Sequence, residues 1–187
     1  MRKNNIIMKI LVRKIIKIFL YIHIHTNMNI NKENMQKACK LAVSSVQRGS
    51  GPFGAIIIKN DTKEVIGKGH NMVTLANDPT MHAEIVAIRD ACHSLDTFKL
   101  ENCTLYTSCE PCPMCLSAAY WAHISTIYYG NTKIDAKNIG FDDAFIYEEL
   151  QKDNSERSIK MIHLDECNEY AKEAFNMWTA KEDKTPY

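Results

Sequence analysis

The sequence predicts an α/β protein in which a mixed β-sheet lies between layers of helices. Two extended segments, 53–59 and 64–71, follow each other across a short polar turn at Asn60-Asp61, which favours an antiparallel hairpin. Later extended segments alternate with helical ones, which favours parallel strands joined by crossover helices. The 187 residues are sufficient for one domain with a sizeable core.

Each element follows from its hydrophobic period and from its start and stop signals. Residues 33–48 place apolar side chains on one stripe of a helix, which Gly49-Ser50-Gly51-Pro52 ends. The continuous apolar run at 53–59 suits a strand that is covered on both faces. Asp78-Pro79 predicts the start of a helix, because aspartate caps helices and proline suits their first position. The later elements are expected to be strands at 103–107, 125–130 and 158–164, and helices at 111–122, 142–150 and 166–180.

Composition is that of an ordinary globular protein, but charge is unevenly distributed. Six of the 23 basic residues and none of the 22 acidic residues lie in 1–31, so residues 32–187 carry a formal charge of −5. An acidic body disfavours a nucleic-acid partner, which would need a field of lysine and arginine. The seven cysteines form no regular framework and three of them crowd together, which favours metal binding in the reducing cytoplasm.

Residues 1–31, called the leader below, are expected to lie outside the folded domain, which spans 32–187. Their apolar residues are too often interrupted to span a bilayer, and no signal-peptide cleavage site follows. Three interpretations stay open: a gene-model extension with the working start at Met28 or Met35, an organelle-targeting segment, and a membrane-associated segment. No membrane partner is expected for 32–187. The charged residues that interrupt the apolar run are Lys9, Arg13, Lys14 and Lys17.

Two short segments carry the strongest chemical signal. His82-Ala83-Glu84 is followed, about thirty residues later, by Pro111-Cys112-Pro113-Met114-Cys115, a pattern typical of zinc-dependent deaminases. His82, Cys112 and Cys115 are therefore predicted to bind one zinc ion, and a catalytic site of this kind keeps its fourth position for water. A C-x-x-C pair alone would be weak evidence, because redox motifs share it. The competing interpretation is a set of buried cysteines and an ordinary core histidine.

The spacing of these residues suits hydrolysis by a metal-activated water. Cys112 and Cys115 are three residues apart at the start of a predicted helix, so both thiols face one side where the helix dipole favours thiolates. Glu84 is predicted to be the catalytic acid and base that moves protons from the water to the leaving amine. A fourth ligand at Cys109 would displace that water, so this residue is expected to be a buried neighbour.

With these residues in view, the chain resembles the cytidine deaminase-like superfamily, and nearly all of 32–187 resembles its small guanine deaminase branch. The resemblance implies a three-layer α/β/α sandwich with a five-stranded mixed sheet, and one zinc ion per subunit. It also implies conversion of guanine to xanthine and ammonia, and a homodimer that exchanges C-terminal segments. The matching stretches are Gly51–Ala55, Asn77–Glu84, Tyr106–Cys115 and Gly140-Phe141-Asp142-Asp143.

The resemblance further implies a set of purine-binding residues. Asn71 and Asp143 would form hydrogen bonds with the purine base, Phe53 would stack on it, and Trp121 and Tyr187 would close the pocket from this chain or from a partner subunit. Taken alone, Asp143 suits a helix N-cap and Asn71 suits the end of a strand or a turn.

Three other functions stay open from sequence. A tRNA adenosine deaminase shares the zinc motif, although the acidic body and the Phe141-Asp142-Asp143 segment argue against it. A cytosine or nucleoside deaminase is a second enzymatic alternative. A non-catalytic zinc-binding interaction module is a third, and the presence of Glu84 argues against it.

Overall fold

The computed structural model describes residues 2–186 and contains one mixed sheet of four strands in the order β2-β1-β3-β4. β1 is antiparallel to both of its neighbours, whereas β3 and β4 are parallel. The predicted hairpin and the predicted parallel pair are both confirmed. The strands are β1 (Gly54–Lys59), β2 (Val65–His70), β3 (Cys103–Cys109) and β4 (Thr126–Asn131).

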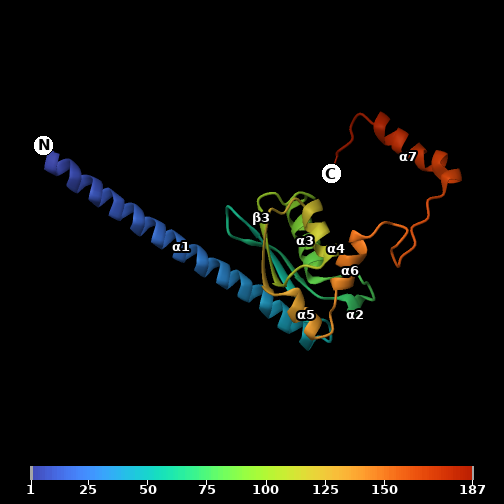
Figure 1. Cartoon of the computed structure of the whole chain (residues 1–187), viewed down its shortest axis with the longest axis horizontal. Helices are drawn as coiled ribbons and strands as arrows, with labels where there is room; N and C mark the ends of the chain where they lie inside the picture. Colours follow the sequence, from blue (N-terminus) through green and yellow to red (C-terminus); the bar gives the residue numbers. More distant parts are fainter. Residues whose placement is uncertain (1, 187) are drawn as a thin grey trace.

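Helices cover both faces of this sheet (Figure 1). Successive side chains of a strand point to opposite faces, and β1 buries both of its faces. Ile57 belongs to a core cluster with Ala87 of α3, whereas Ile56 packs on the other face with Ala38 of α1. The predicted three-layer α/β/α architecture is therefore confirmed. The helices of the two outer layers are α1 (Arg2–Gln47), α3 (Ala83–Leu95) and α4 (Pro113–Trp121).

Two glycines let helices lie directly on the sheet. A Cβ atom at Gly69 of β2 would lie 2.0 Å from the carbonyl oxygen of Ala83, at the start of α3. A Cβ atom at Gly54 of β1 would lie 2.3 Å from the carbonyl oxygen of Ala38 in α1. These contacts are with backbone atoms that cannot swing aside, so both positions need glycine. The contact at Gly69 fixes the end of α3 that carries His82 and Glu84.

The first helix is continuous from Arg2 to Gln47, so the predicted helix at 33–48 is its C-terminal part. That part packs on the sheet, while the N-terminal half extends away from the domain (Figure 1). The hydroxyl of Tyr106 donates a hydrogen bond of 2.7 Å to Oδ1 of Asn31, at the boundary between the two halves. Among residues 2–186, none of the helices has the length and hydropathy needed to cross a membrane.

The predicted fifth strand at 158–164 does not form, so the sheet described by residues 2–186 has four strands instead of five. After α6 the chain leaves the body as an extended C-terminal arm, residues 152–186, that carries α7 (Figure 1). Ile159 and Ile162 are each 77% exposed. Their composition favours a strand, but in the single chain the segment has no neighbouring strand with which to pair. The remaining elements are α2 (Val73–Ala76), α5 (Lys133–Asn138), α6 (Ala144–Gln151), a 3-10 turn at Asp165–Cys167 and α7 (Asn168–Ala180).

Candidate metal centre and active site

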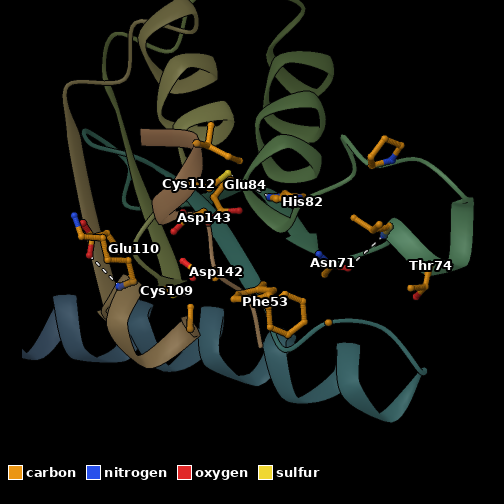
Figure 2. Close-up of a pocket in the computed structure, with 17 residues that line it drawn as sticks. Phe53, Asn71, Thr74, His82, Glu84, Cys109, Glu110, Cys112, Asp142 and Asp143 are labelled. Atoms are coloured by element: carbon orange, nitrogen blue, oxygen red, sulfur yellow. Dashed lines mark hydrogen bonds between the residues drawn. The ribbon is translucent and has the colours of Figure 1, made fainter. Parts of the chain in front are cut away.

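A pocket of about 410 Å³ opens where the loops after β2 and β3 meet the starts of α3, α4 and α6. Figure 2 shows His82, Glu84, Cys112 and Asp143 close to one another in this pocket, with Phe53 and Asn71 also on its wall. These six residues were all predicted as site residues, and the fold brings them together from five separate parts of the chain.

Two helix N-termini supply the predicted metal ligands. His82 is the N-cap of α3 and Cys112 is the N-cap of α4, while Cys115 lies in the first turn of α4. The helix predicted to start at Asp78-Pro79 begins later, at Ala83. Asp78 instead accepts hydrogen bonds from the backbone and hydroxyl groups of Thr80 and closes a turn, a competing use of aspartate that the sequence signal does not separate from capping.

The three donors have the spacing of a tetrahedral zinc site. Nδ1 of His82 lies 3.5 Å from Sγ of Cys112 and 3.5 Å from Sγ of Cys115. Bond lengths of about 2.0–2.1 Å for Zn–N and about 2.3 Å for Zn–S place such donors about 3.6 Å apart at a tetrahedral angle. Within residues 2–186, this trio is the group of histidine, cysteine and acidic side chains with metal-binding spacing.

Cys109 does not join this group. Its Sγ lies 3.7 Å from the carbonyl oxygen of Thr132, and burial raises the pKa of its thiol to about 11. This placement agrees with the expected buried neighbour and leaves a fourth coordination position for a water molecule.

The carboxyl group of Glu84 is held beside the three donors. Its Oε1 accepts a hydrogen bond of 2.8 Å from the hydroxyl of Thr107, and its Oε2 lies 3.4 Å from Sγ of Cys115. Glu84 is buried, and burial is the main cause that raises the pKa of its carboxyl. A glutamate whose pKa is raised toward neutrality is suited to both take up and release a proton.

The close contacts among the three donors shift the pKa values of all three side chains. Contact with Cys115, followed by contact with His82, lowers the pKa of Cys112 to about 4. The same pairing raises the pKa of Cys115, since two adjacent thiolates repel each other. Contact with Cys112 raises the pKa of His82. A dication at this point would relieve the repulsion and replace the proton that Cys115 keeps.

Sequence reasoning missed Thr107. It is fully buried in the middle of β3, and its hydroxyl donates a hydrogen bond to Glu84. A polar side chain inside a strand whose every residue is buried must have a hydrogen-bond partner, and that rule was the available signal. The identity of the partner depends on how α3 lies across the sheet.

Asn71 presents hydrogen-bond donors to the pocket. Its side-chain oxygen accepts hydrogen bonds from the hydroxyl of Ser50 (2.8 Å) and from the backbone N–H of Val73 (3.2 Å). The backbone group can only donate, so it fixes the oxygen at this place. The amide N–H groups are therefore left for a ligand. Phe53, also on the wall, is steadied by an edge-to-face contact with Phe141 at 4.9 Å.

Two predicted pocket residues are not part of this wall. Trp121 is 65% exposed at the end of α4 and lines a separate groove of about 530 Å³ with Ile85, Ile88 and Phe98. Tyr187 lies outside the described residues. Of the five predicted substrate-binding residues, Asn71, Phe53 and Asp143 therefore line the pocket of a single chain.

Comparison with known proteins identifies the family. Residues 28–131 match the model of the cytidine and deoxycytidylate deaminase zinc-binding region. The chain belongs to this deaminase family. The match includes the three donors and Glu84, whose geometry fits zinc, so zinc is the cofactor of this deaminase. Asp143 and the C-terminal arm lie beyond the matched region.

Two curated relatives and one crystal structure place this deaminase more narrowly. Guanine deaminase of Bacillus subtilis is 50% identical over 131 residues, which cover 70% of this chain and 83% of the relative. A tRNA-specific adenosine deaminase of Aquifex aeolicus is 35% identical over 141 residues, which cover 75% and 91%. The X-ray structure of the Bacillus subtilis guanine deaminase superposes with a TM-score of 0.76 at 43% identity, and covers 83% of this chain and 98% of that one.

Proposed function

We propose that this deaminase hydrolyses guanine to xanthine and ammonia. The observation that carries the proposal is the buried carboxyl of Glu84 beside three zinc donors on the wall of a pocket of about 410 Å³. The 50% identity with a guanine deaminase supports guanine as the substrate. A pocket of this volume suits a small ligand such as a purine base.

His82, Cys112 and Cys115 would hold the zinc ion. When bound, zinc lowers the pKa of a water molecule so that it serves as a hydroxide nucleophile near neutral pH. Glu84 would take up a proton of that water on Oε2, the carboxylate oxygen that does not accept from Thr107. The same carboxyl would then pass that proton to the ring nitrogen next to the amino-bearing carbon. It would next take the remaining proton from the added hydroxyl group and pass it to the amine, which leaves as ammonia while the carbon–oxygen double bond forms.

Three pocket residues would hold the base during these transfers. The amide N–H groups of Asn71 would donate to the carbonyl oxygen of guanine. The Asp143 carboxylate would accept from a ring N–H or amino group, which requires its ionised form, although burial raises the pKa of Asp143. The ring of Phe53 would stack against the purine.

This arrangement favours guanine over adenine. Adenine lacks the carbonyl oxygen, so the donors of Asn71 would stay without an acceptor. A site built to satisfy a polar group rejects analogues without that group by about 10⁴–10⁵-fold. Asn71 is buried, so water would not easily replace the missing contact.

The test is release of ammonia from guanine, adenine, cytosine and a tRNA anticodon stem-loop. Activity on guanine at least about a hundredfold above the others is the expected result. The tRNA substrate is the main competitor, because a tRNA-specific adenosine deaminase matches 141 residues of this chain. Activity confined to tRNA or to cytosine would overturn the proposal. A chain that binds zinc and deaminates nothing would be a zinc-binding interaction module.

We also propose that the chain forms a homodimer that exchanges its C-terminal arms, with Trp121 and Tyr187 closing the partner's pocket. The arm exposes large apolar side chains, including Phe175 (75%) and Met177 (69%). Exposed apolar surface of this extent is normally covered by another chain. Light scattering would give twice the chain mass of 21.4 kDa. A monomeric, fully active enzyme would exclude the exchange.

We propose that residues 32–187 form the zinc deaminase domain and that the protein is located in the cytoplasm. Seven free cysteines suit a reducing compartment. A chain that begins at Met28 keeps Asn31, the hydrogen-bond partner of Tyr106, and is expected to fold and to deaminate guanine at the full-length rate. An insoluble or inactive product would contradict this boundary.

A further inference from the structure

The N-terminal half of α1, up to Asn31, exposes apolar and basic side chains that have no role in deamination. This half stands clear of the sheet and of the other helices (Figure 1). Its described apolar side chains are open to water, with Val12 and Ile15 each 46% exposed, Ile16 52% and Ile18 57%. A run of exposed apolar side chains on one element marks an interaction surface.

These side chains are segregated from the charged ones around the helix axis. Successive residues of an α-helix lie about 100° apart. On this basis, one arc of about 200° holds the exposed apolar residues Val12, Ile15, Ile16, Ile18 and Leu20, whereas Tyr21 lies among the basic residues. A separate arc, about 100° wide, holds the basic residues Arg13, Lys14 and Lys17. The helix is therefore amphipathic here, with one apolar side and one cationic side.

We propose that this part of α1 binds the surface of membranes that contain anionic phospholipids. The basic arc would face the phosphate-bearing headgroups while the apolar arc enters the boundary of the acyl chains. Charge complementarity favours this occupant, because residues 1–31 carry six basic residues and no acidic residue. A nucleic acid would satisfy the basic arc but leave the apolar arc in water. A second copy would cover the apolar arc but leave the basic arc without an anionic partner.

The leader would act as the anchor and the domain would stay in solution. Residues 32–187 carry a formal charge of −5, so an anionic surface repels the domain itself. The helix rises about 1.5 Å per residue, which places Asn31 about 20 Å along the axis from Ile18. That distance exceeds the Debye length of about 8 Å, so attraction of the leader and repulsion of the domain act separately.

Co-sedimentation with vesicles tests this proposal on the full chain. The chain should sediment with vesicles of equal parts phosphatidylcholine and phosphatidylserine, and not with phosphatidylcholine alone. The double variant Lys14→Gln/Lys17→Gln should bind about 30-fold more weakly, and Ile15→Ser/Ile16→Ser should also lose binding. The matched control Lys32→Gln/Lys40→Gln removes the same charge from exposed positions of the same helix, close to the domain, and should bind as the natural chain does.

Three results would overturn it: no sedimentation with the anionic vesicles, equal sedimentation with both vesicle types, or undiminished binding of the Lys14/Lys17 variant. Light scattering without lipid would show whether the apolar arc binds a second copy instead. In that case the natural chain would form a larger assembly than the Ile15→Ser/Ile16→Ser variant does. Circular dichroism and guanine deamination report whether each variant is folded. The vesicle result does not depend on which base the enzyme deaminates.

Discussion

Thr107→Val tests whether the hydrogen bond to Glu84 positions the catalytic carboxyl. Valine has nearly the shape of threonine, so the fully buried site keeps its packing while Oε1 of Glu84 loses a donor at 2.8 Å. A hydrogen bond to a charged group contributes about 1.5–3 kcal/mol. If the hydrogen bond stabilises the reactive orientation of the carboxyl in the transition state, its loss lowers kcat about 10- to 150-fold. KM for guanine should change little, because Thr107 does not line the pocket.

Thr104→Val is the matched control. Thr104 lies on the same strand, is also buried, and donates a hydrogen bond of 2.7 Å to Asn60, away from the site. Both variants should lose similar thermal stability, but Thr104→Val should keep its kcat. Steady-state kinetics, zinc content and thermal unfolding would be measured on both. Equal losses of kcat in the two variants would mean that the sheet, and not the carboxyl, was disturbed. An unchanged kcat in Thr107→Val would refute the positioning role.

The remaining predictions concern the catalytic carboxyl, one glycine and one surface network. Glu84→Gln should retain one zinc ion per chain but lose about 10²–10⁴-fold in kcat; near-normal turnover would remove Glu84 from the mechanism. Gly69→Ala should lower stability by about 1–3 kcal/mol and weaken zinc retention, because the new Cβ meets the Ala83 carbonyl at 2.0 Å; an unchanged melting temperature would disprove this close approach. Contacts with Lys152 and Ser158 lower the pKa of Glu149 to about 2. Their stabilising effect should be present above the ordinary pKa of this carboxyl and be lost as the pH falls through about 2; an NMR titration with a midpoint above 4 would exclude the network.

The chemistry of this protein was predictable because its motif residues keep a recognisable order and spacing and lie at helix N-termini. Cys112 and Cys115 meet within one helical turn, and the order of His82 and Glu84 before them fixed the donor set. The structure adds the distances of 3.5 Å that a zinc ion needs. Thr107 could not be assigned in the same way, because the zinc motif does not include it and its hydroxyl meets Glu84 only after α3 packs on the sheet.

Elements that depend on local sequence patterns were predicted correctly. The strand expected at 158–164 was not, because a strand also needs a neighbouring strand with which to pair. The hairpin and the parallel crossover followed from turns and helical segments between strands. The segment 158–164 has the composition of a strand, but a strand forms only beside a partner, and in the single chain this segment extends away from the body (Figure 1). The start of α3 was placed too early, because Asp78 closes a turn with Thr80 instead of capping the helix.

X-ray absorption at the zinc edge of the loaded enzyme would show whether the zinc ion has three protein ligands and one open position. Two sulfur atoms at about 2.3 Å, one imidazole nitrogen at about 2.0–2.1 Å and one further oxygen atom are expected. Exposure to a guanine-like inhibitor should change only the oxygen shell. A third sulfur atom, contributed by Cys109, or a second protein nitrogen would mean that the fourth position is closed to water, and would contradict the account.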